Sequence, residues 1–290
     1  MVRVNGGLAN QMFQYALGLA LAKIAGGPLL VDTADVDGDA KREYELDACG
    51  PPPKRVSSAG RILMRAARST PMWHLCGRRW SHMAPGGPRI VREQGQAFDP
   101  RVLSLSGSLI LEGYWQSEEY FKHCRPLIEQ TFDWTTTARR EVADSLVRAI
   151  EAPGSVAVHV RRGDYVSEPA TKSFHGVCGP DYYRRAAGIV CEHVADPLFF
   201  IFSDDIDWAE ANLDLPGSRT AVRHSHAVAP HVDMWLMSRC RHAIIANSSY
   251  SWWAAWLTER PGKCIVAPQQ WFRAPHMKSI TPVPARWKVT

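Results

Sequence analysis

The stretch SVAVHVRRGDY, residues 155–165, shows most clearly what kind of fold this chain forms. Its first six residues make one of four short runs that are apolar almost throughout; the others are LFFIFS at 198–203, HAIIAN at 242–247 and KCIVAP at 263–268. Such runs are typical of parallel strands in a sheet that is covered on both faces. Segments with helical periodicity separate them, at 181–194, 207–213, 232–241 and 249–259. The second half of the chain is therefore predicted to be a doubly wound α/β domain.

The amino end has a β-α-β pattern. The short apolar run MVRV ends at Gly6-Gly7, helical periodicity follows over 10–24, and LLVD at 29–32 has the composition of a second strand. A helix between two strands of this kind predicts that the strands are parallel.

The rest of the first half is predicted to contain a strand near 108–113 and helices over 117–130 and 136–150. The Pro-Gly segment at 151–154 is the best candidate for a domain boundary. We therefore expect two α/β domains, at 1–151 and 152–290.

Composition bounds the function. The chain has 290 residues, 46% hydrophobic and 22% charged, which is typical of a globular protein. A net charge of +5 is too small to predict a nucleic-acid partner. The amino end resembles no signal peptide, and no apolar run approaches the roughly 20 residues that span a bilayer, so we expect a cytoplasmic protein. The seven cysteines lack a CxxC pair or clustered metal ligands, which predicts reduced thiols, no metal site and no cofactor.

The segment 54–92 is strongly basic and contains no acidic residue. Its cations are Lys54, Arg55, Arg61, Arg65, Arg68, Arg78, Arg79, Arg89 and Arg92. One interpretation is a solvated surface. The other is peripheral docking on the inner face of an anionic membrane, where a lipid-linked glycan acceptor would be presented. The sequence leaves both open.

The first candidate cluster follows the run SVAVHV. In a doubly wound sheet, ligands bind beyond the carboxyl ends of the strands, which is where His159, Arg161, Arg162 and Asp164 lie. Adjacent guanidinium groups bind phosphate oxygens in bidentate fashion and stay charged at any working pH. The loop is therefore either a diphosphate site or a structural ion pair between Arg162 and Asp164.

Two further clusters follow later strands. Ser203, Asp204 and Asp205 either cap a helix or place a carboxylate on a nucleoside or on an arginine of the first cluster. The third cluster is Asn247, Ser248 and Ser249. A helix begins after it, so its N–H groups and hydroxyls either receive an anion or cap that helix. Three tryptophans follow, Trp252, Trp253 and Trp256, and we predict that they are core residues.

A fourth cluster lies at the first turn, where Gly6 and Gly7 precede Asn10 and Gln11. A glycine turn before a helix can receive a phosphate or a sugar. It is not the GxGxxG fingerprint of dinucleotide-binding domains.

Together these motifs resemble glycosyltransferase family 11, the α-1,2-fucosyltransferases. The resemblance covers nearly the whole chain in the expected order. It rests on GGLANQMFQYA at 6–16, EGYWQSEEYF at 112–121, HVRRGDYV at 159–166, FSDDI at 202–206 and DMWLMSRCRHAIIANSSYSWWAAWL at 233–257. Two positions depart from the family pattern: Ala9 replaces a glycine of the first turn, and Tyr250 replaces a phenylalanine.

The resemblance implies a GT-B-like architecture of two facing Rossmann-like domains with parallel sheets. It implies inverting, metal-independent transfer of L-fucose from GDP-β-L-fucose to a glycan hydroxyl, most often the 2-hydroxyl of a galactose. The C-terminal domain would hold GDP-fucose, and the N-terminal domain would shape the acceptor cleft.

Roles for the clusters follow from this mechanism. Arg161, with Arg162, is assigned to the β-phosphate, and Asp204 or Asp205 to the nucleoside. Asn247, Ser248 and Ser249 would donate hydrogen bonds to GDP-fucose, with His159 and Ser203 beside them. Gly6, Gly7, Asn10 and Gln11 would close over the diphosphate or fucose.

The acceptor hydroxyl needs a base, and the candidates are Asp164 and His175. The same donor residues could serve a fucosyltransferase of another linkage or acceptor, or a non-catalytic protein that binds a nucleotide sugar. The sequence does not separate these alternatives.

Overall fold

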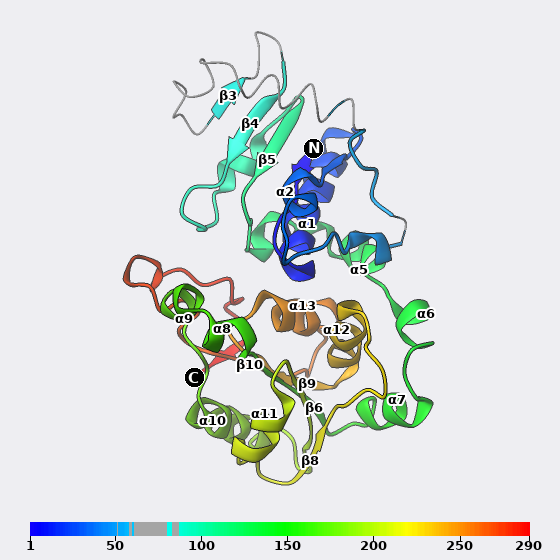
Figure 1. The fold of residues 1–290 in the computed structure, drawn as a ribbon, viewed down its shortest axis with the longest axis vertical. Coiled ribbons are helices and arrows are strands. Elements are labelled where there is room, and N and C mark those ends of the chain that lie inside the picture. Colours follow the sequence, from blue (N-terminus) through cyan, green and yellow to red (C-terminus); the bar gives the residue numbers. More distant parts are fainter. Residues whose placement is uncertain (51, 58–59, 61–79, 83–86) are drawn as a thin grey trace. The chain divides into compact units, whose positions relative to one another are not determined.

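The computed structural model describes residues 1–50, 52–57, 60, 80–82 and 87–290. The chain divides into two compact units, Met1–Asp133 and Trp134–Thr290 (Figure 1). Most of the basic segment 54–92 lies outside the described residues, as does Cys76. The six other cysteines are free thiols.

The N-terminal unit is built around a five-stranded sheet with the strand order β2-β1-β5-β4-β3. Its strands are β1 (Val2–Arg3), β2 (Val31–Asp32), β3 (Trp80–His82), β4 (Arg89–Arg92) and β5 (Leu109–Glu112). β3 is antiparallel to β4, and the other neighbours are parallel. The α-helices described in this unit are α1 (Leu8–Ala25), α2 (Ala34–Asp37) and α5 (Arg125–Thr131), with 3₁₀ helices at Leu46–Ala48, Pro100–Ser104, Glu118–Tyr120 and Lys122–Cys124.

The β-α-β pattern predicted at the amino end is confirmed. β1 and β2 are parallel, with Val2 opposite Val31, and α1 connects them. Gly6, in the turn before α1, has a φ of 70°, which glycine adopts without steric cost. Most of α1 is buried, including Phe13 and Leu17, so this helix forms much of the core of the unit.

The C-terminal unit contains a six-stranded, fully parallel sheet with the strand order β11-β10-β9-β6-β7-β8. Its strands are β6 (Ser155–Val160), β7 (Leu198–Ser203), β8 (Ser218–Ala221), β9 (His242–Ile244), β10 (Ile265–Ala267) and β11 (Lys288–Val289). The chain fills one side of β6 with β7 and β8, then returns to the other side with β9, β10 and β11. The four predicted strands are all present, and the doubly wound topology is confirmed.

Helices cover both faces of this sheet (Figure 1). They are α6 (Thr135–Ala138), α7 (Asp144–Ile150), α8 (Gly163–Ser167), α9 (Pro169–His175), α10 (Pro180–Cys191), α11 (Ile206–Asn212), α12 (Pro230–Arg239) and α13 (Ser249–Leu257), with a 3₁₀ helix at Pro275–Met277. α10 and α11 pack on one face, and α12 and α13 lie on the other (Figure 1). The predicted α/β fold class, with parallel sheets in two units, is therefore confirmed.

The central strand β6 is buried along its whole length because both of its faces are covered. Val156, Val158 and Val160 belong to the core cluster formed with α10 and α11. Successive side chains of a strand point to opposite faces, so Ser155 and His159 face α12 and α13. Accordingly, the His159 ring lies 5.6 Å from the ring of Tyr250 in α13.

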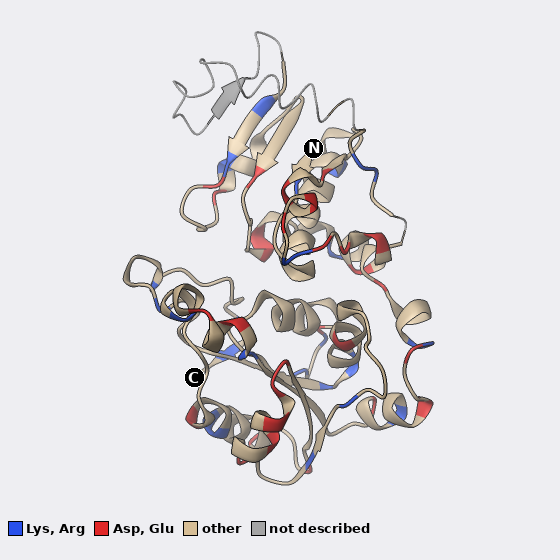
Figure 2. Ribbon diagram, viewed as in Figure 1, with Lys and Arg blue, Asp and Glu red and all other residues tan. Residues whose placement is uncertain are grey.

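Helix α13 belongs to the core, as predicted for its tryptophans. Trp252, Trp253 and Trp256 are fully buried and pack on one another, with ring centroids 5.1–5.9 Å apart. The helix has no charged residue and is tan throughout in Figure 2. A helix that is apolar on all sides is stable in water only when other parts of the protein enclose it.

Two predictions about helices were wrong. The segment 117–130 forms two short 3₁₀ helices before α5, and 136–150 is divided into α6 and α7. Pro126 stands in the first turn of α5, where proline starts a helix but does not continue one from the preceding turn. The division between the units falls at Asp133 and Trp134, ahead of 151–152, since α6 and α7 both pack on α12.

The turn that enters β6 yields the first prediction. A Cβ at Gly154 would lie 2.3 Å from the backbone oxygen of Asp196. The Gly154 carbonyl accepts a hydrogen bond from the Leu198 N–H, which holds the two segments together. Gly154→Ala is expected to lower the free energy of unfolding by about 1–3 kcal/mol, because backbone must shift. Urea unfolding measures the change. The control is Gly188→Ala in α10, where the added Cβ meets nothing within 4 Å and should stabilise by about 0.5–1 kcal/mol. Equal stability of Gly154→Ala and the wild type would contradict this account.

Candidate active site

The polar residues that follow β6, β7 and β9 lie at one edge of the C-terminal sheet, because these strands are parallel neighbours. The strand order reverses between β6 and β9. Ligands of doubly wound folds bind at such a switch point, beyond the carboxyl ends of the strands. The first three clusters identified in the sequence therefore belong to one candidate site.

Arg161 is held by two carboxylates and is still partly open to solvent. Its guanidinium group lies 2.6 Å from Asp164 Oδ1 and 2.9 Å from Asp204 Oδ2. It also lies 5.6 Å from the centre of the Tyr165 ring. The side chain is 27% exposed, so it is oriented without being enclosed.

Arg162 is more completely engaged. Its Nε lies 3.0 Å from Asp205 Oδ2, and its Cζ lies 3.6 Å above the Trp208 ring of α11, a cation–π contact. Its side chain is 18% exposed, less than that of Arg161. The structural ion pair considered for Arg162 forms with Asp205, whereas Asp164 pairs with Arg161.

Asp204 connects the loops after β6 and β7. Its Oδ1 accepts from the Arg162 backbone N–H at 2.8 Å, while Oδ2 contacts the Arg161 guanidinium. A Cβ at Gly163 would lie 2.7 Å from Oδ2, so glycine at this position permits the close approach. Ser203 Oγ accepts from the Asp205 N–H at 2.9 Å and fixes the start of this loop.

The third cluster holds neighbouring loops in place. Asn247 is buried, and its Nδ2 donates to the carbonyl oxygens of His175 at 2.9 Å and Trp271 at 3.3 Å. Ser248 is the N-cap of α13, and its Oγ accepts from the Tyr250 N–H. The Asn247 amide is thus engaged by backbone groups, and Ser248 and Ser249 form the amino end of α13.

His175 and Arg161 both lie against the Tyr165 ring. The imidazole stacks on the Tyr165 ring, with centroids 4.8 Å apart, and the Tyr165 hydroxyl donates to the Asn247 carbonyl. Burial lowers the pKa of His175 to about 4, although the Asp164 charge acts in the opposite direction. His175 is therefore neutral at pH 7. Its Nδ1 is buried and has no hydrogen-bond partner among the described residues.

His159 is buried on the α13 side of β6, with 5% of its surface exposed. Burial, and secondarily the Arg161 charge, lowers its pKa to about 3, so this imidazole is also neutral at pH 7.

The fourth cluster belongs to the N-terminal unit. The Gln11 amide is fully buried, donates to the carbonyl oxygens of Gly6 and Glu43, and accepts from the Glu45 N–H. These hydrogen bonds hold the turn to the segment around Glu45, and the ligand contact of Gln11 stays a prediction. Asn10 Oδ1 accepts from Gln116, and Gly7 is the N-cap of α1.

The two departures from the family pattern have simple structural explanations. Ala9 lies inside α1 rather than in the glycine turn, so it needs no special backbone conformation. The Tyr250 hydroxyl donates to the Pro230 carbonyl at the start of α12, a hydrogen bond that phenylalanine could not make.

Among the described residues, no group of three or more histidine, cysteine, aspartate or glutamate side chains is placed to hold a metal ion. No helix in the same residues is long and apolar enough to cross a bilayer.

Comparison with known proteins identifies the family. Residues 102–287, more than half of the chain, match the model of glycosyl transferase family 11. The chain belongs to glycosyltransferase family 11. It is therefore a glycosyltransferase, as the resemblance of its motifs predicted.

Three similar proteins illustrate the range of this likeness. The chain is 32% identical to an alpha-1,2-colitosyltransferase of Escherichia coli, over 99% of this chain and 97% of that protein. It is 28% identical to the galactoside 2-alpha-L-fucosyltransferase Sec1 of Mus musculus, over 89% of this chain and 64% of that protein. The crystal structure of fucosyltransferase NodZ from Bradyrhizobium is 15% identical, with a TM-score of 0.46 over 87% of this chain and 91% of that one.

One aromatic residue of the candidate site was not predicted from the sequence. Trp208, which lies over the Arg162 guanidinium, stands in α11 and has no motif around it. Its spacing from Asp204, four residues earlier, was the available signal, since both belong to the same strand-to-helix connection.

The neutral state of His159 yields the second prediction. The pKa of His159 is lowered in the folded protein, so the unfolded chain binds the additional proton and stability falls as pH drops from about 6.5 to about 3. His159→Asn should reduce this dependence by up to about 1.4 kcal/mol per pH unit. Chemical unfolding at pH 4, 5, 6 and 7 measures the free energy of unfolding of the wild type and of His159→Asn. His226→Asn, at an exposed histidine of the same unit, is the control. Parallel profiles for His159→Asn and the wild type would show that His159 does not resist protonation.

Proposed function

We propose that this chain transfers L-fucose from GDP-β-L-fucose, with inversion, to the 2-hydroxyl of a galactose-containing glycan. The observation that carries the proposal is the position of Arg161: it follows the central strand at the switch point of the sheet, oriented by two carboxylates and partly exposed. The C-terminal unit is the proposed donor-binding part, and the N-terminal unit the acceptor-side part. The E. coli relative is named an alpha-1,2-transferase and the mouse relative a galactoside 2-alpha-transferase, and both names support the proposed linkage.

The chemistry requires a cation where Arg161 stands. Displacement at the anomeric carbon builds negative charge on the departing diphosphate, and a donor fixed beforehand stabilises that charge without reorganising. Arginine suits this role because its planar group binds two phosphate oxygens and stays charged. Arg161 has N–H groups beyond those that face Asp164 and Asp204, so it can keep its orientation while it binds the β-phosphate.

The remaining clusters take roles that follow from their exposure. Asp204 is engaged through both oxygens and positions the two arginines. Asp205 is 41% exposed and is the proposed contact for the nucleoside, with Ser203 beside it. The amino end of α13, at Ser248 and Ser249, would add donors for the diphosphate.

The third prediction tests Arg161. Arg161→Ala is expected to lower kcat by about 10²–10³ because the lost interaction acts on the charge of the transition state. The control is Arg184→Ala, an exposed arginine of α10 that pairs with Asp181 outside the site. Initial rates at saturating donor and circular dichroism of each variant measure rate and fold. Retention of more than a tenth of the wild-type rate would remove Arg161 from the proposed role.

Asp164 is the proposed base for the acceptor hydroxyl. Its carboxylate is 24% exposed and lies 2.6 Å from the group that would hold the leaving phosphate. His175 is less suited, since its Nδ1 is buried and has no hydrogen-bond partner among the described residues.

The fourth prediction separates these two residues. Asp164→Asn should lower kcat by about 10²–10⁴, the usual contribution of general-base catalysis, and remove the acidic limb of the pH–rate profile. Binding of GDP, measured by calorimetry, should stay near the wild-type value. If Asp164→Asn also weakens GDP binding, Asp164 only positions the arginine. If His175→Ala alone loses the acidic limb, the base is His175.

One experiment tests the donor sugar, the linkage and the metal requirement. Colitose is fucose without the 3-hydroxyl group, and a site that hydrogen-bonds a substrate hydroxyl discriminates strongly against the analogue that lacks it. The protein is incubated in EDTA with lactose and either GDP-fucose or GDP-colitose, and the product linkage is determined. We expect an α-1,2-linked fucose and a higher kcat/KM for GDP-fucose. A preference for GDP-colitose, which the E. coli relative makes the second candidate, would replace the proposed donor.

A further inference from the structure

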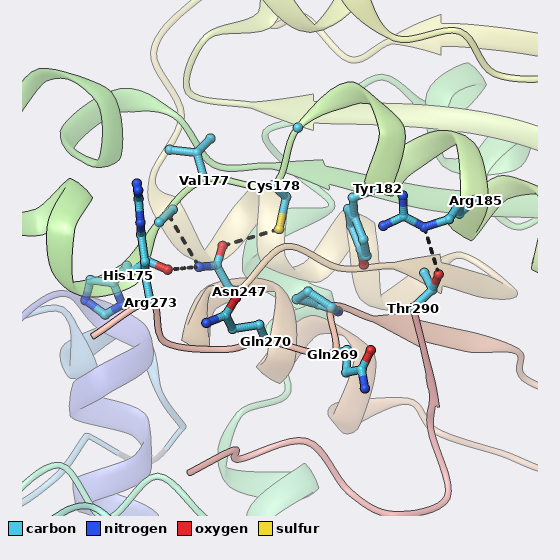
Figure 3. Close-up of a pocket in the computed structure, with 13 residues that line it drawn as sticks. His175, Val177, Cys178, Tyr182, Arg185, Asn247, Gln269, Gln270, Arg273 and Thr290 are labelled. Atoms are coloured by element: carbon cyan, nitrogen blue, oxygen red, sulfur yellow. Dashed lines mark hydrogen bonds between the residues drawn. The ribbon is translucent and has the colours of Figure 1, made fainter. Parts of the chain in front are cut away.

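A second polar pocket lies beside the candidate donor site, within the C-terminal unit. Its volume is about 450 Å³, and its walls come from the loop between α9 and α10, the first turns of α10 and the segments that follow β9 and β10 (Figure 3). We call it the α10 pocket. A volume of this order is typical of a site for a small molecule. Neither Arg161 nor Arg162 contributes to its lining.

Two arginines give the α10 pocket its charge. Arg273 and Arg185 line it from different sides (Figure 3), and none of the 13 lining residues is an aspartate or a glutamate. The Arg185 Nε lies 3.2 Å from the hydroxyl of Thr290. No carboxylate of the described part of the chain forms an ion pair with either guanidinium group. Arg161 and Arg162 differ in this respect, since both are paired with aspartates.

Uncharged donors complete the lining. The side chains of Gln269 and Gln270 stand between the two arginines in Figure 3, on the segment after β10. Gly179 is the N-cap of the 12-residue helix α10 and has no side chain to cap it. Asp181, the acidic residue of the first turn, pairs with Arg184 at 2.6 Å, is 79% exposed and does not line the pocket. The lining therefore offers positive charge and N–H donors.

We propose that the α10 pocket binds a phosphate-bearing ligand, at a site separate from the Arg161 cluster. Two guanidinium groups without a carboxylate partner match a ligand group with two or more negative charges, and arginine binds phosphate oxygens in bidentate fashion. The pocket borders the donor site through His175 and Asn247, which join the two. A diphosphate that links an acceptor glycan to its carrier has this chemistry, and so does a soluble phosphate compound.

The test uses the full chain and inorganic pyrophosphate, titrated by calorimetry at low salt. Arg273→Gln and Arg185→Gln should each raise Kd by about 10- to 100-fold, the loss of one charge-assisted contact. Both residues are exposed, so neither change should affect folding. Arg184→Gln is the matched control, because this neighbouring arginine of α10 does not line the pocket and should leave Kd unchanged.

A second arm separates this proposal from the proposed donor site. Pyrophosphate binding should persist in Arg161→Ala, whether or not the protein binds GDP. In the wild type, saturating GDP should not displace it. Geranyl diphosphate in place of pyrophosphate distinguishes the source: tighter binding points to a lipid-linked diphosphate, and equal binding to a soluble phosphate compound.

Three results would overturn the proposal. They are the absence of pyrophosphate binding, binding that Arg273→Gln and Arg185→Gln leave unchanged, and binding that is lost entirely in Arg161→Ala or in the presence of saturating GDP. The last would show that the anion occupies the Arg161 cluster instead.

Discussion

The position of the Asp204 carboxylate determines the geometry of the whole candidate site. It accepts the Arg162 N–H through one oxygen and holds the Arg161 guanidinium through the other. β6 and β7 pair along six residues, and beyond their ends the Asp204 carboxylate connects the two loops. Gly163 permits the contact, since a larger residue would meet Asp204 Oδ2. In the RRGD motif, both arginines therefore depend on Asp204, which lies 42 residues after Arg162 in the chain.

This arrangement fixes a cation before any ligand arrives. A long arginine side chain normally loses much conformational freedom when it binds, and a contact formed beforehand reduces that loss. The carboxylates that orient Arg161 also repel an incoming diphosphate. They fix the guanidinium group but weaken its net attraction for the anion. The α10 pocket has the opposite design, with two exposed arginines that no described carboxylate neutralises. The first design suits a transition state of fixed geometry, and the second suits recognition of an anion by its charge.

The sequence predicted the fold well where burial repeats in a simple pattern. The four apolar runs became β6, β7, β9 and β10 because a strand covered on both faces must be apolar along its length. Edge strand β8, with the exposed sequence SRTA, carries no such pattern and was not predicted. Helices over 117–130 and 136–150 were wrong because apolar periodicity alone does not show where proline and local capping interrupt a helix. The edge that holds the candidate site followed from the parallel direction of the strands, because their carboxyl ends meet at one edge of a doubly wound sheet.

The roles of single motif residues depend on contacts that sequence alone does not contain. Gln11 and Asn247 were predicted to contact a ligand, yet both amides are buried and bonded to backbone groups more than 30 and 70 residues away, in addition to nearer ones. A buried amide must be satisfied by the protein itself, whereas a charged group such as Arg161 or Asp205 stays partly in water and is available to a ligand. Exposure in the folded state separates the two kinds of residue: the amides are bonded within the protein, and the charged groups remain partly open to solvent.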